Sequence, residues 1–131
     1  MAAYVYDANE VNTNIDGKIV TGYSEGTMVS CSKDEEKFST KVSAKGDVSV
    51  ATKNNPLGTI TLTLSMGSPF VPYLNKLANT AQTFPIWVTG GQEKIGGTEA
   101  MVKKPADAEF SDEIGDREFE IQVFDYTVLE Q

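Results

Sequence analysis

Residues 59–65, TITLTLS, alternate strictly between polar and apolar side chains, and this alternation limits the folds open to the chain more than any other feature. Ile60, Leu62 and Leu64 occupy one set of alternate positions, and three threonines occupy most of the other. Successive side chains of a strand point to opposite faces of a sheet, so a period of two predicts a β-strand with one buried face. The other face is polar but still compatible with a strand, because threonine is β-branched.

An apolar stripe at helical spacing follows this strand. Ser68 is a suitable N-cap, and Pro69 suits the first helical position, where its missing N–H costs no hydrogen bond. The stripe then lies on one face of a helix that ends near Thr80. Its members are Phe70, Tyr73, Leu74 and Leu77. We expect the helix either to cover an open side of the β-structure or to complete the core of a monomer.

The remaining strand signals are short and are separated by turns. They occupy residues 3–7, 18–23, 27–32, 37–53, 84–91, 98–104 and 117–129, the last being the longest single strand. Within 37–53 the polar composition predicts a long hairpin or arm with its tip near residues 45–47, and NNPLG at 54–58 predicts a turn. Together these signals predict a mainly β protein, an antiparallel β-barrel or sandwich of about eight strands with one flanking α-helix. A length of 131 residues indicates a single domain, residues 1–131.

Two glycine-containing turns add detail to this prediction. Asp16-Gly17 predicts a tight hairpin turn, since glycine accepts the positive φ that such turns require. Gly90-Gly91 and Gly96-Gly97 enclose four residues in GGQEKIGG, which lacks the sequence context of a phosphate-binding loop. We interpret this segment as a mobile hairpin end.

Reactive side chains are scarce in this sequence. Histidine, the commonest general base and metal ligand, is absent. Cys31 lies in a strand pattern without an activating histidine, so we expect a buried structural thiol rather than a nucleophile. The acidic segment 107–116 lacks the spacing of an EF-hand loop, and Trp87 is interpreted as a core or interface anchor. The chain is therefore predicted not to be an enzyme, with no catalytic, cofactor-binding or metal-binding residues.

The charge balance also excludes some partners. The formal net charge is −8, from 19 acidic and 11 basic residues, and the acidic residues concentrate between Asp107 and Glu130. Specific binding of nucleic-acid phosphates requires clustered lysine and arginine, so this balance argues against it. No apolar run approaches the roughly 20 residues that cross a bilayer, so no membrane insertion is expected. The N-terminal residues lack signal-peptide character, which predicts a mature N-terminus and synthesis in the cytoplasm.

Three segments, taken in order, resemble a known group of proteins. They are DGKIVTGYSEGTMVSCSKDEEKFS (16–39), NNPLGTITLTL (54–64) and IGDREFEIQV (114–123). Their order and spacing are similar to those of the tail tube proteins of contractile-tailed bacteriophages and R-type bacteriocins. The resemblance extends over roughly residues 4–126, and the tube protein of the type VI secretion system shares the architecture.

This resemblance implies a structural subunit of an inner tail tube. Six copies would form a ring, and the rings would stack around a channel inside a contractile sheath. The implied partners are further copies of the chain, the sheath protein, and the baseplate or tube initiator and the terminator. In a phage, DNA would pass through the lumen without specific binding, and the chain would belong to a virion. In a bacteriocin it would belong to a DNA-free, phage-tail-like particle, and either particle would be assembled in the bacterial cytoplasm.

The resemblance also assigns roles to particular residues. It implies that residues 38–56 form an arm that contacts the adjacent ring, including Lys41, Val42, Lys45, Asp47 and Val48. We hypothesise that Asp34, Glu35 and Glu36, or the C-terminal acidic residues, face the lumen, because an acidic lining lets DNA slide.

Two other interpretations stay open. A small-ligand-binding β-barrel is the main alternative of another class, and it would require a large apolar cavity. Other structural roles in the same particle, such as a tube terminator, form the second. The sequence does not choose between a phage and a bacteriocin.

Overall fold

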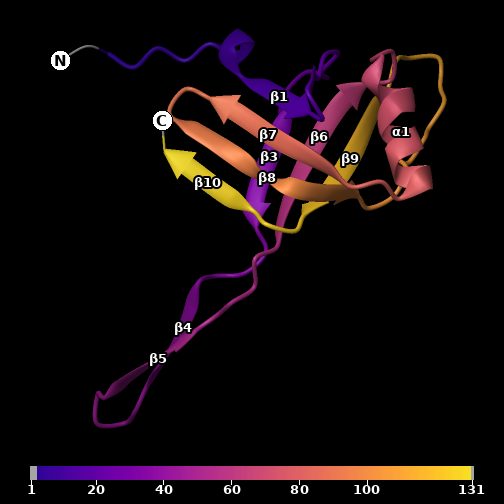
Figure 1. Ribbon diagram of the computed structural model, residues 1–131. Coiled ribbons are helices and arrows are strands. Elements are labelled where there is room, and N and C mark those ends of the chain that lie inside the picture. The colour runs from indigo at the N-terminus through magenta and orange to yellow at the C-terminus, as the bar shows by residue number, and fades with distance from the viewer. Residues whose placement is uncertain (1–2, 131) are drawn as a thin grey trace.

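The computed structural model describes residues 3–130, so residues 1, 2 and 131 of the predicted domain lie outside the described residues. These residues form one 3₁₀ turn, one α-helix and ten strands (Figure 1). The elements are η1 (Ala8–Glu10), β1 (Asn12–Ile15), β2 (Lys18–Ile19), β3 (Val29–Lys33), β4 (Phe38–Val42), β5 (Val48–Thr52), β6 (Gly58–Ser65), α1 (Phe70–Thr80), β7 (Phe84–Gly90), β8 (Glu93–Val102), β9 (Asp116–Val123) and β10 (Thr127–Glu130). This composition confirms the predicted mainly β class with one flanking helix.

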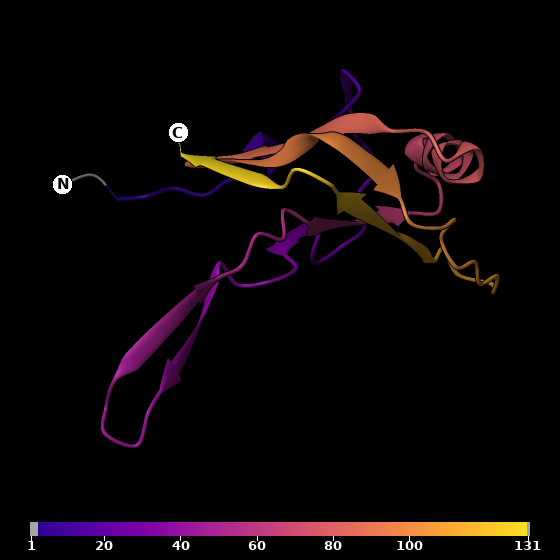
Figure 2. The same ribbon diagram turned by 60° about the horizontal axis from the view of Figure 1, so that its bottom comes forward.

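Eight of the strands form one antiparallel sheet that folds over on itself. Its order is β2-β1-β7-β8-β9-β6-β3, and β10 pairs with β8 beside this path. The first half of β8 pairs with β7 and β10, Ala100 pairs with both β7 and β9, and Met101 and Val102 pair with β9. β8 therefore passes from one layer to the other, and Figure 2 shows β7, β8 and β10 above β9, β6 and β3, with α1 at one end.

The core lies between these layers and comes from the alternating strands. In β6 every second residue is fully buried, including Ile60, Leu62 and Leu64, as the sequence predicts. Leu62 lies opposite Phe119 of β9, which is also fully buried. Other buried members are Ile15, Val20, Leu74, Leu77, Phe84, Ile86, Val88, Ala100, Val102, Ile121 and Val123. The interior is thus filled by aliphatic and aromatic side chains from both layers and the helix.

The helix begins at Phe70, one position after the predicted first residue, Pro69. Pro69 occupies the capping position with φ −65° and ψ −15°, and the Ser68 hydroxyl accepts a hydrogen bond from the Phe70 N–H at 3.2 Å. The same hydroxyl donates to the Thr21 carbonyl at 2.6 Å, which ties the helix start to the β2–β3 connection. The helix ends at Thr80, where Ala81 adopts the left-handed conformation with φ 52°.

The predicted turn at Asp16-Gly17 is confirmed. It joins β1 to β2 through a two-residue loop in which both residues have positive φ, 52° and 83°. The Gly17 N–H donates to the Asn14 side-chain oxygen at 2.8 Å, which supports the turn from within the hairpin.

Two strand predictions near the N-terminus are wrong. Residues 3–7 form no strand; this segment is extended chain followed by η1, whose start is capped by the Asp7 side chain. The segment 18–23 contributes only the two residues of β2 and an isolated bridge at Tyr23. A strand needs a partner for its backbone groups, and an apolar aromatic pattern alone does not supply one.

The glycine-rich segment and the final strand also differ from prediction. Gly96 and Gly97 lie inside β8, the longest strand, rather than in a mobile hairpin end. Gly96 has φ 153°, and a side chain at Gly97 would collide with Asp125 and Val123. The predicted strand 117–129 is split into β9 and β10 by a turn at Phe124 and Asp125.

Asp125 explains this split. Its carboxylate accepts hydrogen bonds from the Thr98 N–H at 3.0 Å, the Thr98 hydroxyl at 2.6 Å and the Glu99 N–H at 3.1 Å. Burial alone would raise the pKa of Asp125, but these hydrogen bonds together outweigh it, so the pKa lies below its ordinary value. The carboxylate thus holds the turn against β8, which lacks side chains at Gly96 and Gly97.

The alternation in β6 leads to a direct test. Leu62→Ala should lower the free energy of unfolding by about 2–5 kcal/mol, because it empties a fully buried site. The neighbouring outward-facing control, Thr61→Ala, should cost less than about 1 kcal/mol. Urea denaturation of both variants checks this, and equal losses would contradict the assigned core face.

Candidate assembly surfaces

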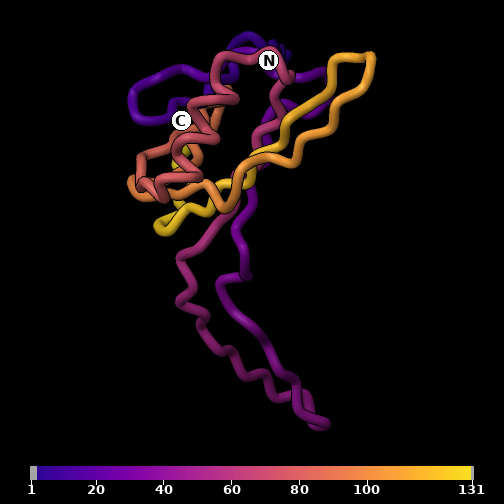
Figure 3. Tube along the Cα trace, turned by 90° about the vertical axis from the view of Figure 1, so that its right-hand side faces the viewer, coloured from indigo at the N-terminus to yellow at the C-terminus, as the bar shows by residue number. Residues whose placement is uncertain are grey.

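The β4–β5 hairpin forms an arm that projects from the rest of the molecule. Its two strands pair only with each other among the described residues, with Phe38 opposite Thr52 and Val42 opposite Val48. All ten strand residues are exposed, and the views in Figures 1 and 3 show the hairpin extending well beyond the two layers. We use the name arm for residues 37–53, because the Lys53 N–H donates to the Lys37 carbonyl at 2.8 Å and closes the hairpin.

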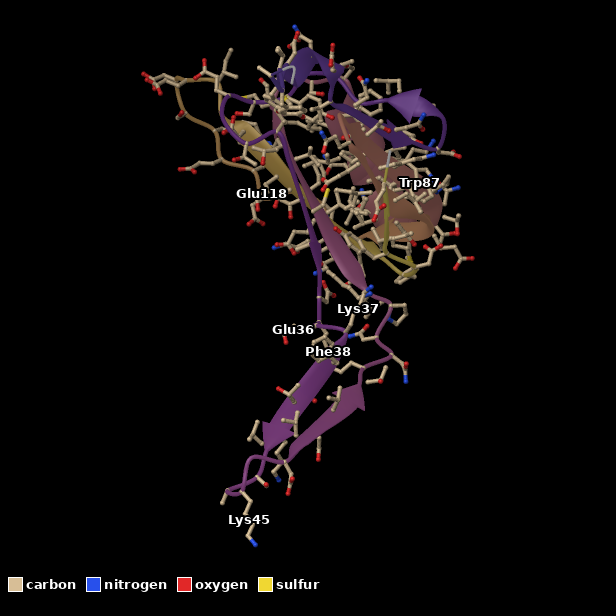
Figure 4. All side chains as sticks on the ribbon, turned by 90° about the vertical axis from the view of Figure 1, so that its left-hand side faces the viewer. Glu36, Lys37, Phe38, Lys45, Trp87 and Glu118 are labelled. Carbon is tan, nitrogen blue, oxygen red and sulfur yellow. The ribbon has the colours of Figure 1, made fainter. Side chains whose placement is uncertain are left out.

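The arm residues singled out from the sequence lie in the outer half of this hairpin. Val42 and Val48 form the last strand pair, Lys41 precedes it, and Lys45 and Asp47 belong to the connecting loop. Lys45 extends from the tip in Figure 4. The loop is held by the Ser43 N–H, which donates to the Asp47 carbonyl at 2.8 Å, and by a turn at Gly46 with φ 90°.

The two faces of the arm differ in chemistry. Directly paired residues point to the same side, so one face carries Phe38, Thr40, Val42, Val48, Val50 and Thr52. The opposite face carries Ser39, Lys41, Ser49 and Ala51. Phe38 is 54% exposed, and the three valines are between 62% and 63% exposed. An isolated two-stranded hairpin is only marginally stable in water, so this apolar face is a surface without a partner in the single chain.

The root of the arm is fastened to the outer face of the sheet by Asp34. Its carboxylate accepts hydrogen bonds from the Thr59 hydroxyl at 2.8 Å and from the Gln122 amide at 3.0 Å. Gln122 also donates to the Gly58 carbonyl at 2.7 Å, so β3, β6 and β9 meet at this point. The hydrogen bond from Gln122, and then that from Thr59, hold the pKa of Asp34 below its ordinary value.

Tyr126 packs against the same root from the C-terminal side. The Tyr126 N–H donates to the Pro56 carbonyl at 3.0 Å, and its ring lies where a side chain at Gly58 would stand. Burial, with smaller contributions from the charges of Cys31 and Glu93, raises the pKa of Tyr126 to about 12. The ring is therefore neutral, and the turn before β10 and the arm root share one packed contact.

A ladder of acidic and hydroxyl side chains covers the outer face of the β6–β9 pair. Asp116 lies opposite Ser65, Glu118 opposite Thr63 and Glu120 opposite Thr61. We use the name body for the described residues outside the arm, and Figure 4 shows Glu118 and Trp87 on opposite sides of it. With the loop 103–115, this face encloses an open cavity of about 390 Å³ lined by Thr63, Lys104, Asp107, Asp116, Glu118 and Glu120. Exposed ion pairs, Lys103–Glu120 and Lys104–Asp107, each at 3.5 Å, offset only part of this negative charge.

The proposed lumen acids lie at one end of this ladder. Asp34 continues it through its hydrogen bonds to Thr59 and Gln122, the last outward-facing pair of β6 and β9. Glu35 and Glu36 are exposed in the connection from β3 to the arm, and Figure 4 shows Glu36 beside Lys37 at the arm root. The alternation within β6 and within β9 is visible in the sequence, but the pairing of the β6 threonines with the β9 acidic residues is not.

The helix residues proposed for packing divide into two groups. Leu74 and Leu77 are buried in the core, whereas Phe70 and Tyr73 are half-buried against its edge. The rings of Phe70 and Tyr73 meet edge to face with centroids 5.8 Å apart. The Lys18 ammonium lies 4.2 Å from the Tyr73 ring centroid, so the β1–β2 hairpin caps this edge.

Two further side chains singled out from the sequence are Cys31 and Trp87. Cys31 is half-buried, and burial, together with the charge of Glu93, raises the pKa of its thiol to about 11. Trp87 carries the Lys94 ammonium 4.8 Å from its ring centroid. Within residues 3–130, no group of three or more carboxylate or thiol side chains is arranged to hold a metal ion. The described part of the chain also has no helix long and apolar enough to span a membrane.

Comparison with known proteins identifies the fold. No protein-family model matches this sequence, and a sequence comparison with curated proteins gives no match. Among solved structures, the chain superposes on a sheath/tube terminator of the extracellular contractile injection system PVC with a TM-score of 0.73 and 14% identity, covering 100% of this chain and 99% of that one. The chain has a phage tail tube-like fold.

Two further structures agree with this assignment. The tube-terminating cap of the anti-feeding prophage gives a TM-score of 0.68 at 14% identity, covering 100% of this chain and 95% of that chain. A chain of the PVC sheath-tube complex in the extended state gives 0.61 at 13% identity, covering 98% and 93%. These three similar structures are thus components of contractile injection particles.

The Asp34 contact predicts a measurable shift. Gln122→Ala removes one of the two side-chain donors that lower the pKa of Asp34, so this pKa should rise toward its ordinary value. Because the folded-state pKa is depressed, this contact stabilises the fold above the ordinary pKa of aspartate and is lost as the pH falls through the folded value. NMR titration of the Asp34 carboxyl carbon measures the shift. Thr98→Val serves as the control, since it should change the pKa of Asp125 and leave that of Asp34 unaltered.

Proposed function

We propose that this chain is a structural subunit of the inner tube of a contractile tail or contractile injection particle. Six copies form a ring, and the rings stack around a channel inside a sheath. The observation that carries the proposal is the arm. It is an exposed hairpin with an unpartnered apolar face on a fold that matches contractile-particle components over the whole chain.

The assembly roles follow from the surfaces described above. The arm, within the predicted range 38–56, contacts the adjacent ring. The edge strands β3 and β10, each paired on one side only, join neighbouring subunits within a ring. Sheath, initiator and terminator contact the outside and ends of the tube.

The ladder on β6 and β9 is our proposed channel lining. It offers carboxylates and threonine hydroxyls, with Lys103 and Lys104 beside it. Duplex DNA carries about one negative charge per 1.7 Å, so such a lining repels it weakly and lets it slide. The same lining suits a DNA-free particle, and both kinds are assembled in the bacterial cytoplasm.

A tube terminator is the second candidate. The two structures described as terminators have higher TM-scores, 0.73 and 0.68, than the chain from the sheath-tube complex, 0.61. A tube subunit must add to itself without limit, whereas a terminator adds once to a finished end. By contrast, the filled core gives no specific support to a ligand-binding barrel.

Electron microscopy of the purified protein across a concentration series tests the proposal. A tube subunit should form hollow rings at low concentration and tubes with a regular axial repeat at high concentration. Rings that never elongate, but attach to the ends of tubes from a related particle, would support the terminator role instead. A particle that stays monomeric alone and in the presence of a tube initiator complex would overturn both.

Deleting residues 40–52 should separate assembly from folding. These residues pair only within the arm and bury nothing in the core, so thermal unfolding of the shortened chain should resemble that of the intact one. Tubes should be lost, while single rings remain visible in the microscope. An unfolded deletion product would show that the arm belongs to the core.

A further inference from the structure

The arm and the body of this chain carry opposite charge. Residues 37–53 contain four of the 11 basic residues, Lys37, Lys41, Lys45 and Lys53, and one of the 19 acidic ones, Asp47. With a total of −8, the arm therefore carries +3 and the remainder −11. A basic ribbon on an acidic body indicates that the arm is attracted to another copy of the same body.

The body has an apolar cleft at the open side between its two layers. It encloses about 320 Å³, and its floor consists of inward-facing residues of β3, β7 and β8, namely Val29, Cys31, Val88 and Ile95. Tyr4 and Tyr6 of the N-terminal segment form a wall, although both rings are more than 60% exposed. β3 is the last strand of the sheet order, so no further strand of the described chain covers this side.

Acidic residues border this cleft. Glu93 lies in its lining, and Asp7 and Glu10 line an adjoining cavity that shares Tyr4 and Tyr6 with it. The described residues that line the two cavities include no lysine or arginine. The cleft thus combines an apolar floor with an acidic border, which matches an arm with an apolar face and four lysines.

The arm does not reach the cleft of its own chain, because it points away from the body in Figures 2 and 3. We propose that the apolar face of the arm, formed by Phe38, Val42, Val48 and Val50, docks in this cleft on a second copy, and that the net positive charge of the arm favours the acidic border. The inference rests on the tube function proposed above and names the receiving surface of the arm. Arm and cleft are different surfaces, so repetition of the contact extends an assembly rather than closing a pair.

Cys31, the only cysteine of the chain, makes this contact testable. Val48→Cys and Val50→Cys each place a second thiol on the apolar face of the arm, and Ser49→Cys places one on the opposite face as a matched control. The arm buries nothing in the core, so all three variants should fold. Diamide oxidises paired thiols to disulfides, and denaturing, non-reducing gels then show which chains are linked.

We expect ladders of dimers, trimers and longer species from Val48→Cys or Val50→Cys. Each chain then offers its arm to one neighbour and its Cys31 to another. Peptide mass spectrometry should identify the link between the arm and Cys31. Adding Cys31→Ser should remove the ladder, and Ser49→Cys should give only the background level of cross-links.

The outcomes separate this inference from the tube function. Regular tubes whose Val48→Cys and Val50→Cys forms cross-link no more than the Ser49→Cys form would overturn the cleft assignment and leave the tube intact. Ladders through Cys31 in a protein that never forms rings or tubes would support the docking and overturn the tube. The absence of both cross-linked ladders and assemblies would overturn the docking contact and the tube function together.

Discussion

The pairing of β6 with β9 is the interaction on which the rest of the structure depends. Both strands alternate strictly, and their register places Leu62 beside Phe119 inside and Thr63 beside Glu118 outside. A slip of one residue would expose every buried side chain of the slipped strand, each worth about 1.5–3 kcal/mol on burial. This register also brings Gln122 within reach of Asp34, so the same pairing that builds the core fastens the root of the arm.

The arm adds little stability to the single chain, which fits the assembly role proposed for it. Its apolar face is exposed and its strands pair only with each other within residues 3–130, whereas a monomeric protein would gain stability from a shorter or more polar loop. The Asp34 hydrogen bonds and the Tyr126 ring hold only its root. The single chain therefore presents a basic, half-apolar hairpin on a fixed base, and in the proposed assembly the like charge of the acidic bodies would limit contact between them until the hairpin binds.

Prediction from the sequence succeeded where one local pattern was sufficient. The period of β6, a helix start within one residue of the predicted position and the Asp16-Gly17 turn each depend on near neighbours, and all three are present. It failed where contacts between residues far apart in the sequence determine the local structure. Gly96-Gly97 resembles a turn, but Asp125 occupies the space that their missing side chains leave, so the glycines continue β8 while the C-terminal strand breaks.

The sequence by itself determined the β class, the helix at residues 70–80 and the hairpin character of the arm, because each follows from local periodicity or from composition. Only the tertiary structure decided which strands pair across the layers. That pairing places the threonines of β6 beside the acids of β9, sets Asp34 against Gln122 and opens the cleft that contains Cys31. These features join residues far apart in the chain, and their proximity depends on the register of a whole sheet, which no local pattern specifies.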